Sequence, residues 1–223
     1  MSSYADIDKG SSIALDRLPL NRELRSAPPA IKFADAGPLG LFSFALTTFI
    51  LSLYNIGARG ITAPNVVVGM AVASGGLAQF MAGMWEFPRG NTFAATAFSS
   101  YGAFWISYSL ILLPGTGIVA AYKDNTEELE SALGIYLMGW FLITFIFFVV
   151  TLRKNVAFIC LFFCLFTTFL LLGAGALSGL AALHKIGGIV GLVTAFIAFY
   201  TGLSMLLAAE TSPIMKLPLG NIV

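Results

Sequence analysis

Six apolar segments of about 20 residues, separated by short polar connectors, constrain the fold of this chain more than any other feature. A hydrocarbon core of about 30 Å is crossed by about 20 residues of helix, and a backbone surrounded by lipid must make its hydrogen bonds within each helix. The sequence therefore predicts an all-α membrane protein with six transmembrane helices. Their expected bounds are Leu39–Gly57, Val66–Trp85, Thr92–Leu113, Ser131–Leu152, Val156–Leu180 and Ile186–Ala209.

The composition supports a lipid solvent for most of the surface. Hydrophobic residues make up 58% of the 223 residues and charged residues only 10%, whereas soluble domains carry about 25% charged residues. The formal net charge of +1 gives no sign of a nucleic-acid partner. The lipid bilayer is thus the expected partner of the apolar segments.

Short connectors indicate a single membrane domain with two tails. Residues 1–36 form a polar tail that is expected to be mostly disordered. Residues 37–210 are expected to form the six-helix domain, and residues 211–223 a C-terminal tail. Nine Lys and Arg residues fall on the side of the two tails and three on the other side. Because the cytoplasmic side carries the excess of positive charge, both termini are predicted to be cytoplasmic.

Uncharged polar residues recur along the apolar spans and are candidates for lining a solute path. Ser and Thr hydroxyls often bond to their own helix, so each of them alone has a structural explanation. The side-chain amides of Asn55 and Gln79 are costlier in hydrocarbon, so they face either a partner helix or a wet path. The candidates are Thr48, Asn55, Gln79, Glu86, Asn91, Thr96, Ser99 and Ser100.

Charged residues are absent from the middle of every predicted span. Glu86 falls at a helix end, Lys154 in the fourth connector, and the only histidine, His184, in the fifth. Such a path is expected to stabilise an anion through hydroxyls, amides and helix N-termini, without ion pairing. Alternatively, an acid crosses in neutral form. With a pKa of ~4.3 it is neutral in about one molecule in 500 at pH 7 but in roughly one in six at pH 5, so it would carry a proton.

No pattern of catalytic residues emerges, and the chain is not expected to be an enzyme. The Ser99-Ser100-Tyr101 run has no histidine partner for nucleophilic chemistry, and no phosphate-binding glycine loop is present. The two cysteines, Cys160 and Cys164, lie in an apolar run without further metal ligands, so we interpret them as packing residues. Neither a metal nor a cofactor is expected.

One long motif carries a family resemblance. The run GNTFAATAFSSYGAFW, from Gly90 to Trp105, resembles the acetate uptake transporter family, as do Gly75–Gln79 and Ala82–Phe87. That family includes fungal acetate and ammonia-export proteins and a bacterial succinate–acetate permease. The resemblance covers about Pro38 to Gly220. It implies a homohexamer in the plasma membrane, in which each six-helix protomer passes acetate or a similar short-chain monocarboxylate accompanied by a proton.

The resemblance also implies a narrow hydrophobic constriction. Its matching positions here are Phe44 on the first span and Tyr101 on the third, and Leu165 on the fifth is our choice for the third member. An apolar ring of this kind gates by excluding water and favours a small, weakly charged solute. A channel-like mechanism and alternating access both remain compatible with these residues.

The entrance to the first span departs from the family pattern. The family usually begins this helix with Asn-Pro-Ala-Pro-Leu-Gly, whereas this chain has Asp35, Pro38 and Gly40 at the first, fourth and sixth of those positions. Pro38 is predicted at the first helical position, and Asp35 is expected to repel an anion. Two alternative functions therefore stay open: export of ammonia or ammonium, and a membrane acetate sensor without significant flux.

Overall fold

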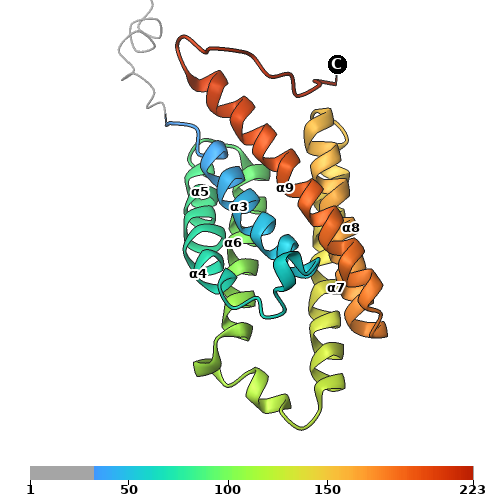
Figure 1. Ribbon diagram of the computed structural model, residues 1–223. Coiled ribbons are helices and arrows are strands. Elements are labelled where there is room, and N and C mark those ends of the chain that lie inside the picture. The colour runs from blue at the N-terminus through green and yellow to red at the C-terminus, as the bar shows by residue number, and fades with distance from the viewer. Residues whose placement is uncertain (1–32, 223) are drawn as a thin grey trace, which may run out of the picture. The chain divides into compact units, whose positions relative to one another are not determined.

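The computed structural model describes residues 33–222, so the prediction of a disordered tail over residues 1–36 concerns mainly residues outside this range. From Gly37 onwards the described chain is mostly helical, and its only β pairing is one bridge between Asn155 and Asn221. Six long helical spans make up most of this part of the chain (Figure 1). Their bounds are α3 Gly37–Asn55, α4–η2–α5 Val67–Glu86, α6 Thr92–Leu112, α7 Thr126–Thr151, α8 Val156–Ser178 and α9 Ala181–Ala209.

The predicted all-α fold with six spans is confirmed. Five of the spans are long and apolar enough to cross a membrane. The remaining one, α6, has 21 residues but carries more Ser and Tyr, so it is less apolar. A helix that is enclosed by neighbouring helices exposes less of its surface to lipid, so it needs fewer apolar side chains. On α6 the side chains of Tyr101, Phe104 and Trp105 are all buried inside the bundle.

The second span is a helix interrupted by a wider turn. It consists of α4 (Val67–Val72), the π-helical turn η2 (Ala73–Ala78) and α5 (Gln79–Glu86). Single π-turns inside α-helices often mark functional sites because they redirect the side chains that follow. Here the first residue after the turn is Gln79, whose side chain is fully buried.

Helix ends explain where the predicted bounds were wrong. The fourth span begins five residues before Ser131, because the side chain of Asn125 caps the first turn by accepting a hydrogen bond from the Glu128 N–H at 3.1 Å. The sixth span begins at Ala181 instead of Ile186, so His184 lies in the first turn of α9 and not in a connector. The fifth span ends at Ser178, since Gly179 adopts φ +66°.

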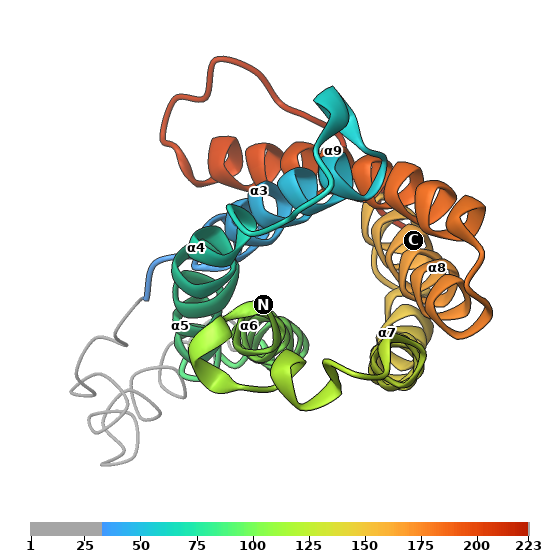
Figure 2. The same ribbon diagram turned by 60° about the horizontal axis from the view of Figure 1, so that its bottom comes forward.

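Each span packs against its neighbours in a ring, in the order α6, α5, α3, α9, α8 and α7 (Figure 2). Small residues allow a close approach between α5 and α6. A Cβ atom added at Gly102 would lie 2.7 Å from the Cβ of Phe80, and one added at Gly83 would meet the backbone of Ser99 at 2.5 Å. Close packing through small residues is the usual means of helix association in lipid.

Aromatic side chains close the ring between α6 and α7, whose backbones do not pack closely. The ring centroids of Phe104 and Trp140 are 5.0 Å apart, and those of Phe104 and Phe169 are 5.2 Å apart. A hydrogen bond of 3.0 Å from the Tyr101 hydroxyl to Thr144 Oγ1 joins the same two helices. Aromatic side chains from α6, α7 and α8 therefore line this part of the bundle interior.

The C-terminal segment folds back onto the start of α8. The N–H groups of Val156 and Ala157 donate to the carbonyls of Gly220 and Leu219, at 2.9 and 3.0 Å. These donors lie in the first turn of α8, where no carbonyl of that helix can reach them. Figure 1 shows that α3 begins and α9 ends at the same end of the bundle.

Candidate solute path

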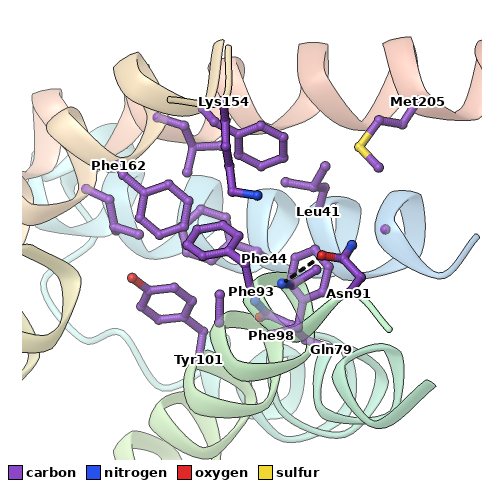
Figure 3. Close-up of a pocket in the computed structure, with 16 residues that line it drawn as sticks. Leu41, Phe44, Gln79, Asn91, Phe93, Phe98, Tyr101, Lys154, Phe162 and Met205 are labelled. Atoms are coloured by element: carbon purple, nitrogen blue, oxygen red, sulfur yellow. Dashed lines mark hydrogen bonds between the residues drawn. The ribbon is translucent and has the colours of Figure 1, made fainter. Parts of the chain in front are cut away.

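Two cavities lie inside the helical bundle, one near each end of it. The Lys154 cavity has a volume of about 110 Å³ and lies where α3, α6 and α8 begin (Figure 3). Its lining residues are Gly37, Leu41, Phe44, Gln79, Asn91, Phe93, Ala94, Ala97, Phe98, Tyr101, Lys154, Phe158, Leu161, Phe162, Leu165 and Met205. A single water needs at least about 10–15 Å³ on this measure, so the cavity can hold a small solute with some water.

The His184 cavity lies toward the opposite end, where α3 ends and α9 begins. It has a volume of about 90 Å³. Its polar lining comes from α3, α6, α8 and α9, and the remaining lining residues are apolar or aromatic. The lining residues are Phe44, Thr48, Leu51, Ser52, Asn55, Phe104, Trp105, Tyr108, Leu137, Leu165, Thr168, Phe169, Leu172 and His184.

Phe44 and Leu165 line both cavities, so they form the partition between them. Both are buried, at 4% and 3% exposure, and Tyr101 lies beside them with its ring centroid 5.7 Å from that of Phe44. The three residues proposed for the constriction therefore come together at one level of the bundle. Their role in gating remains a prediction.

Buried polar atoms without partners all lie along this line of cavities. In residues 33–222, four buried side-chain atoms have no hydrogen-bond partner: Thr48 Oγ1, Gln79 Nε2 and Oε1, and Trp105 Nε1. Gln79 lines the Lys154 cavity, and Thr48 and Trp105 line the His184 cavity. A buried polar group left unsatisfied costs about 1–3 kcal/mol. Water or a polar solute inside the two cavities would remove that cost.

At the end of α5, Glu86 is the centre of a buried hydrogen-bond cluster. It is 0% exposed. Its Oε1 accepts from the Ala36 N–H at 3.1 Å and from Arg89 at 2.6 Å, and its Oε2 accepts from Asn91 Nδ2 at 2.7 Å. This cluster ties the segment before α3 to the connector between α5 and α6. Glu86 therefore supports the wall beside the Lys154 cavity without lining it.

Asp35 is paired, which changes the expectation that it repels an anion. Its carboxylate lies 2.5 Å from Arg89 Nη1 and also accepts from the Gly37 N–H at 2.9 Å. The hydrogen bond to Asp35 is the largest cause of a raised pKa for the Arg89 guanidinium. The cation thus stays charged and offsets the carboxylate at this end of the bundle.

The other predicted entrance residues pack into the start of α3. Pro38 is buried at the second position of the helix, one residue later than predicted. Gly40 is buried against Phe98, since an added Cβ would lie 2.7 Å from that ring. Neither residue lines the two cavities. Their place indicates that they fix the position of α3 and Phe98.

Three predicted path residues on α6 lie outside the cavities. Thr96 is exposed on the outer surface, and its hydroxyl donates to the Thr92 carbonyl at 2.8 Å. Ser99 packs against Gly83 of α5. Ser100 is half-buried and also does not line either cavity. Apart from Glu86, the remaining predicted residues, Thr48, Asn55, Gln79 and Asn91, do line one of them.

Two charged or titratable side chains that were assigned to connectors reach the cavities. Lys154 precedes α8 and points into its cavity, with Nζ 4.5 Å from the centroid of the Phe93 ring (Figure 3). His184 lines the other cavity from the first turn of α9. Both reach the cavities from the ends of spans, so the expectation of spans without charge in their middle is not contradicted, and an anion path without ion pairing stays a prediction. In the sequence, the only sign that these two side chains could reach a cavity is that each lies directly beside an apolar span.

Comparison with known proteins identifies the family. The model of the GPR1/FUN34/yaaH family matches residues 19–220. The chain belongs to this family. It is 47% identical over 199 residues to ammonia transport outward protein 2 of Saccharomyces cerevisiae, covering 89% of this chain and 70% of that protein. It is 48% identical over 186 residues to acetate permease A of Emericella nidulans, covering 78% of this chain and 62% of that protein.

Bacterial members are more distant in sequence and similar in structure. Identity to the succinate-acetate/proton symporter SatP of Escherichia coli is 35% over 191 residues, covering 85% of this chain and 97% of that protein. The solved structure of the bacterial acetate channel SatP superimposes with a TM-score of 0.76 at 35% identity, over 85% of this chain and all of that one. This match confirms the membrane fold, and the names support a transport family over an enzyme.

Proposed function

We propose that this family member passes acetate, or a similar short-chain monocarboxylate, across the membrane through its two cavities. One observation carries the proposal: in residues 33–222, every buried side-chain nitrogen or oxygen without a partner belongs to a residue that lines one of these cavities. Between them, Phe44, Tyr101 and Leu165 would form the hydrophobic constriction. The relatives named as an acetate permease and an acetate channel support this choice of solute.

A proton would accompany the solute. The described lining of the constriction offers no charge to stabilise a carboxylate at its narrowest level, so crossing as the neutral acid has the lower electrostatic barrier. The relative named as a succinate-acetate/proton symporter supports this coupling. Flux is therefore expected to rise as the pH on the acetate side falls.

The proposal includes the predicted oligomeric state of the protein, the membrane that holds it and its orientation in that membrane. A homohexamer in the plasma membrane, with both tails cytoplasmic and a pore in each protomer, is what the family resemblance and the Lys and Arg distribution favour. The membrane domain would extend over residues 37–210. On this orientation the Lys154 cavity faces the cytoplasm and the His184 cavity faces outward.

Export of ammonia or ammonium is the second candidate function. The observation that favours it is the 47% identity to ammonia transport outward protein 2. The two candidates differ in the solute that is carried, so one assay that compares acetate with ammonium can separate them.

The test is solute uptake by liposomes that contain the purified full-length protein. Acetate, succinate, lactate and ammonium are compared, with the outside at pH 5 or pH 7. Faster acetate uptake at pH 5 than in empty liposomes supports the proposal. Uptake equal to that of empty liposomes refutes it, and acetate binding without uptake would favour a sensor.

A matched pair of variants tests the route. Leu165→Trp should block flux because Leu165 separates the two cavities and is only 3% exposed. Leu142→Trp is the control, because Leu142 on α7 is 60% exposed at the outer surface. Equal flux in the two variants would mean that the solute does not pass between the cavities.

A further inference from the structure

We propose that Lys154 is the carboxylate anchor of the Lys154 cavity, so that the solute binds there as an anion between the Lys154 ammonium and the side-chain amide of Gln79. This inference rests on the proposed function and deepens it, since it names the charged form that is selected and the residue that selects it.

The position of Lys154 leaves its charge available. The residue precedes Asn155, whose side chain caps α8 by accepting from the Phe158 N–H at 2.9 Å. In the part of the chain that the structure describes, both ion pairs belong to Arg89, and no carboxylate lies within 4.0 Å of the Lys154 ammonium. Its partner is the face of Phe93 at 4.5 Å. An aromatic face holds a cation more weakly than a carboxylate does, so an entering anion can replace it.

Gln79 supplies the matching hydrogen-bond donor. Its side chain is 0% exposed, and both atoms of its amide lack partners. Figure 3 shows Lys154 entering from the α8 side and Gln79 from the opposite side of the same cavity. A carboxylate has two oxygens, so it can accept from the amide N–H and from the ammonium at once.

The rest of the lining also favours an anion over a cation. None of the described residues that line the cavity is acidic. The nearby carboxylate of Glu86 is occupied by Ala36, Arg89 and Asn91. In addition, α3, α6 and α8 all begin at this end, and helix N-termini carry partial positive charge. An ammonium ion would meet repulsion in this cavity, and a neutral amide could accept a hydrogen bond from the lysine but would lack the attraction between opposite charges.

The experiment compares acetate with acetamide, its neutral analogue of nearly the same shape. Liposomes contain the wild-type protein, Lys154→Gln or Lys154→Arg. The control is Arg153→Gln, which removes the neighbouring exposed charge outside the cavity. Lys154→Gln should raise the KM for acetate about tenfold, the effect typical of losing a charged hydrogen-bond partner, and leave acetamide flux unchanged. Lys154→Arg should stay near wild type, as should Arg153→Gln.

Two outcomes would overturn the anchor. One is a KM for acetate that changes less than twofold in Lys154→Gln, and the other is an equal loss for acetate and acetamide, which would indicate a merely structural role. Thermal unfolding of each variant in detergent checks that it is folded, and Lys154→Met provides a second neutral variant if Lys154→Gln is not.

Acetate binding to detergent-solubilised protein, measured by calorimetry, separates the anchor from the proposed function. If the wild type binds acetate without transporting it and Lys154→Gln binds at least tenfold more weakly, the anchor stands while the transport proposal fails. If the wild type transports acetate and Lys154→Gln binds it equally well, only the anchor fails. If the wild type does not bind acetate at all, both fail.

Discussion

Arg89 pairs with two carboxylates, and we expect their removal to have very different effects on stability. Asp35 and Arg89 are 30% and 25% exposed, whereas Glu86 is 0% exposed. Asp35→Asn keeps an oxygen that can accept from the Gly37 N–H. Glu86→Gln keeps the shape of the side chain but replaces one acceptor oxygen with an NH₂ group.

The expected loss of stability in each variant follows from how deeply the carboxylate is buried. A partly exposed ion pair contributes about 0.2–1 kcal/mol, so Asp35→Asn should stay in that range. In Glu86→Gln at least one donor among Ala36 N, Arg89 Nη1 and Asn91 Nδ2 faces an NH₂ group. Each unsatisfied buried donor costs about 1–3 kcal/mol, and loss of a buried charge partner costs up to about 5 kcal/mol. Because Arg89 keeps Asp35, we expect about 2–4 kcal/mol for Glu86→Gln.

Thermal unfolding followed by fluorescence of the three tryptophans measures the difference. For a chain of this size about 1 kcal/mol shifts Tm by roughly 2–4 °C, so Glu86→Gln should lower Tm by roughly 4–16 °C and Asp35→Asn by at most roughly 4 °C. A double-mutant cycle with Arg89→Gln should give the larger coupling for Glu86. Equal shifts for the two carboxylates, or a larger shift for Asp35→Asn, would refute the argument from burial.

Four other substitutions test the path and its frame. Phe44→Ala should widen the partition and raise the ratio of butyrate to acetate uptake; an unchanged ratio would exclude Phe44 from the constriction. Gln79→Leu should lower acetate flux, because it removes a buried amide that lines the Lys154 cavity; undiminished flux would contradict this. Tyr101→Phe removes the hydrogen bond to Thr144, so it should lower the free energy of unfolding by about 0.5–1.5 kcal/mol. The ratio of butyrate to acetate uptake should stay unchanged, because the ring keeps its size. Asn155→Ala removes the helix cap, so it should lower the free energy of unfolding by about 1 kcal/mol and speed hydrogen exchange of the amides at the start of α8. Unchanged hydrogen exchange would argue against the cap.

The fold could be predicted because hydropathy reports directly on the lipid. Each of the six expected segments became a helical span. The errors fell at helix ends, where hydropathy marks the edge of the hydrocarbon and not the end of the helix. Thus α7 and α9 extend past their apolar cores to Thr126 and Ala181, where polar residues are stable in the interface.

The candidate site was predictable only in part, because helical spacing defines a face without saying where that face points. Thr48 and Asn55 share a face that does line a cavity. Thr96 belongs to an equally regular pattern on α6, yet it is exposed. The difference depends on which neighbours surround each helix, and that is set by packing between residues far apart in the sequence.

The position of a lysine along the proposed path affects how fast a bound carboxylate is released. Two unit charges 4 Å apart attract by about 4 kcal/mol at an effective dielectric constant of 20, but by about 1 kcal/mol in water. A lysine at the dry partition of Phe44 and Leu165 would therefore slow release of a carboxylate by a factor on the order of 1,000, whereas a lysine at a wetter end slows it by a factor of about 5. Lys154 is half-buried and lies before the first turn of α8, while among residues 33–222 no cationic side chain separates the two cavities. At the proposed anchor, a carboxylate would be concentrated beside the partition without being trapped in it, which is the balance that permeation requires.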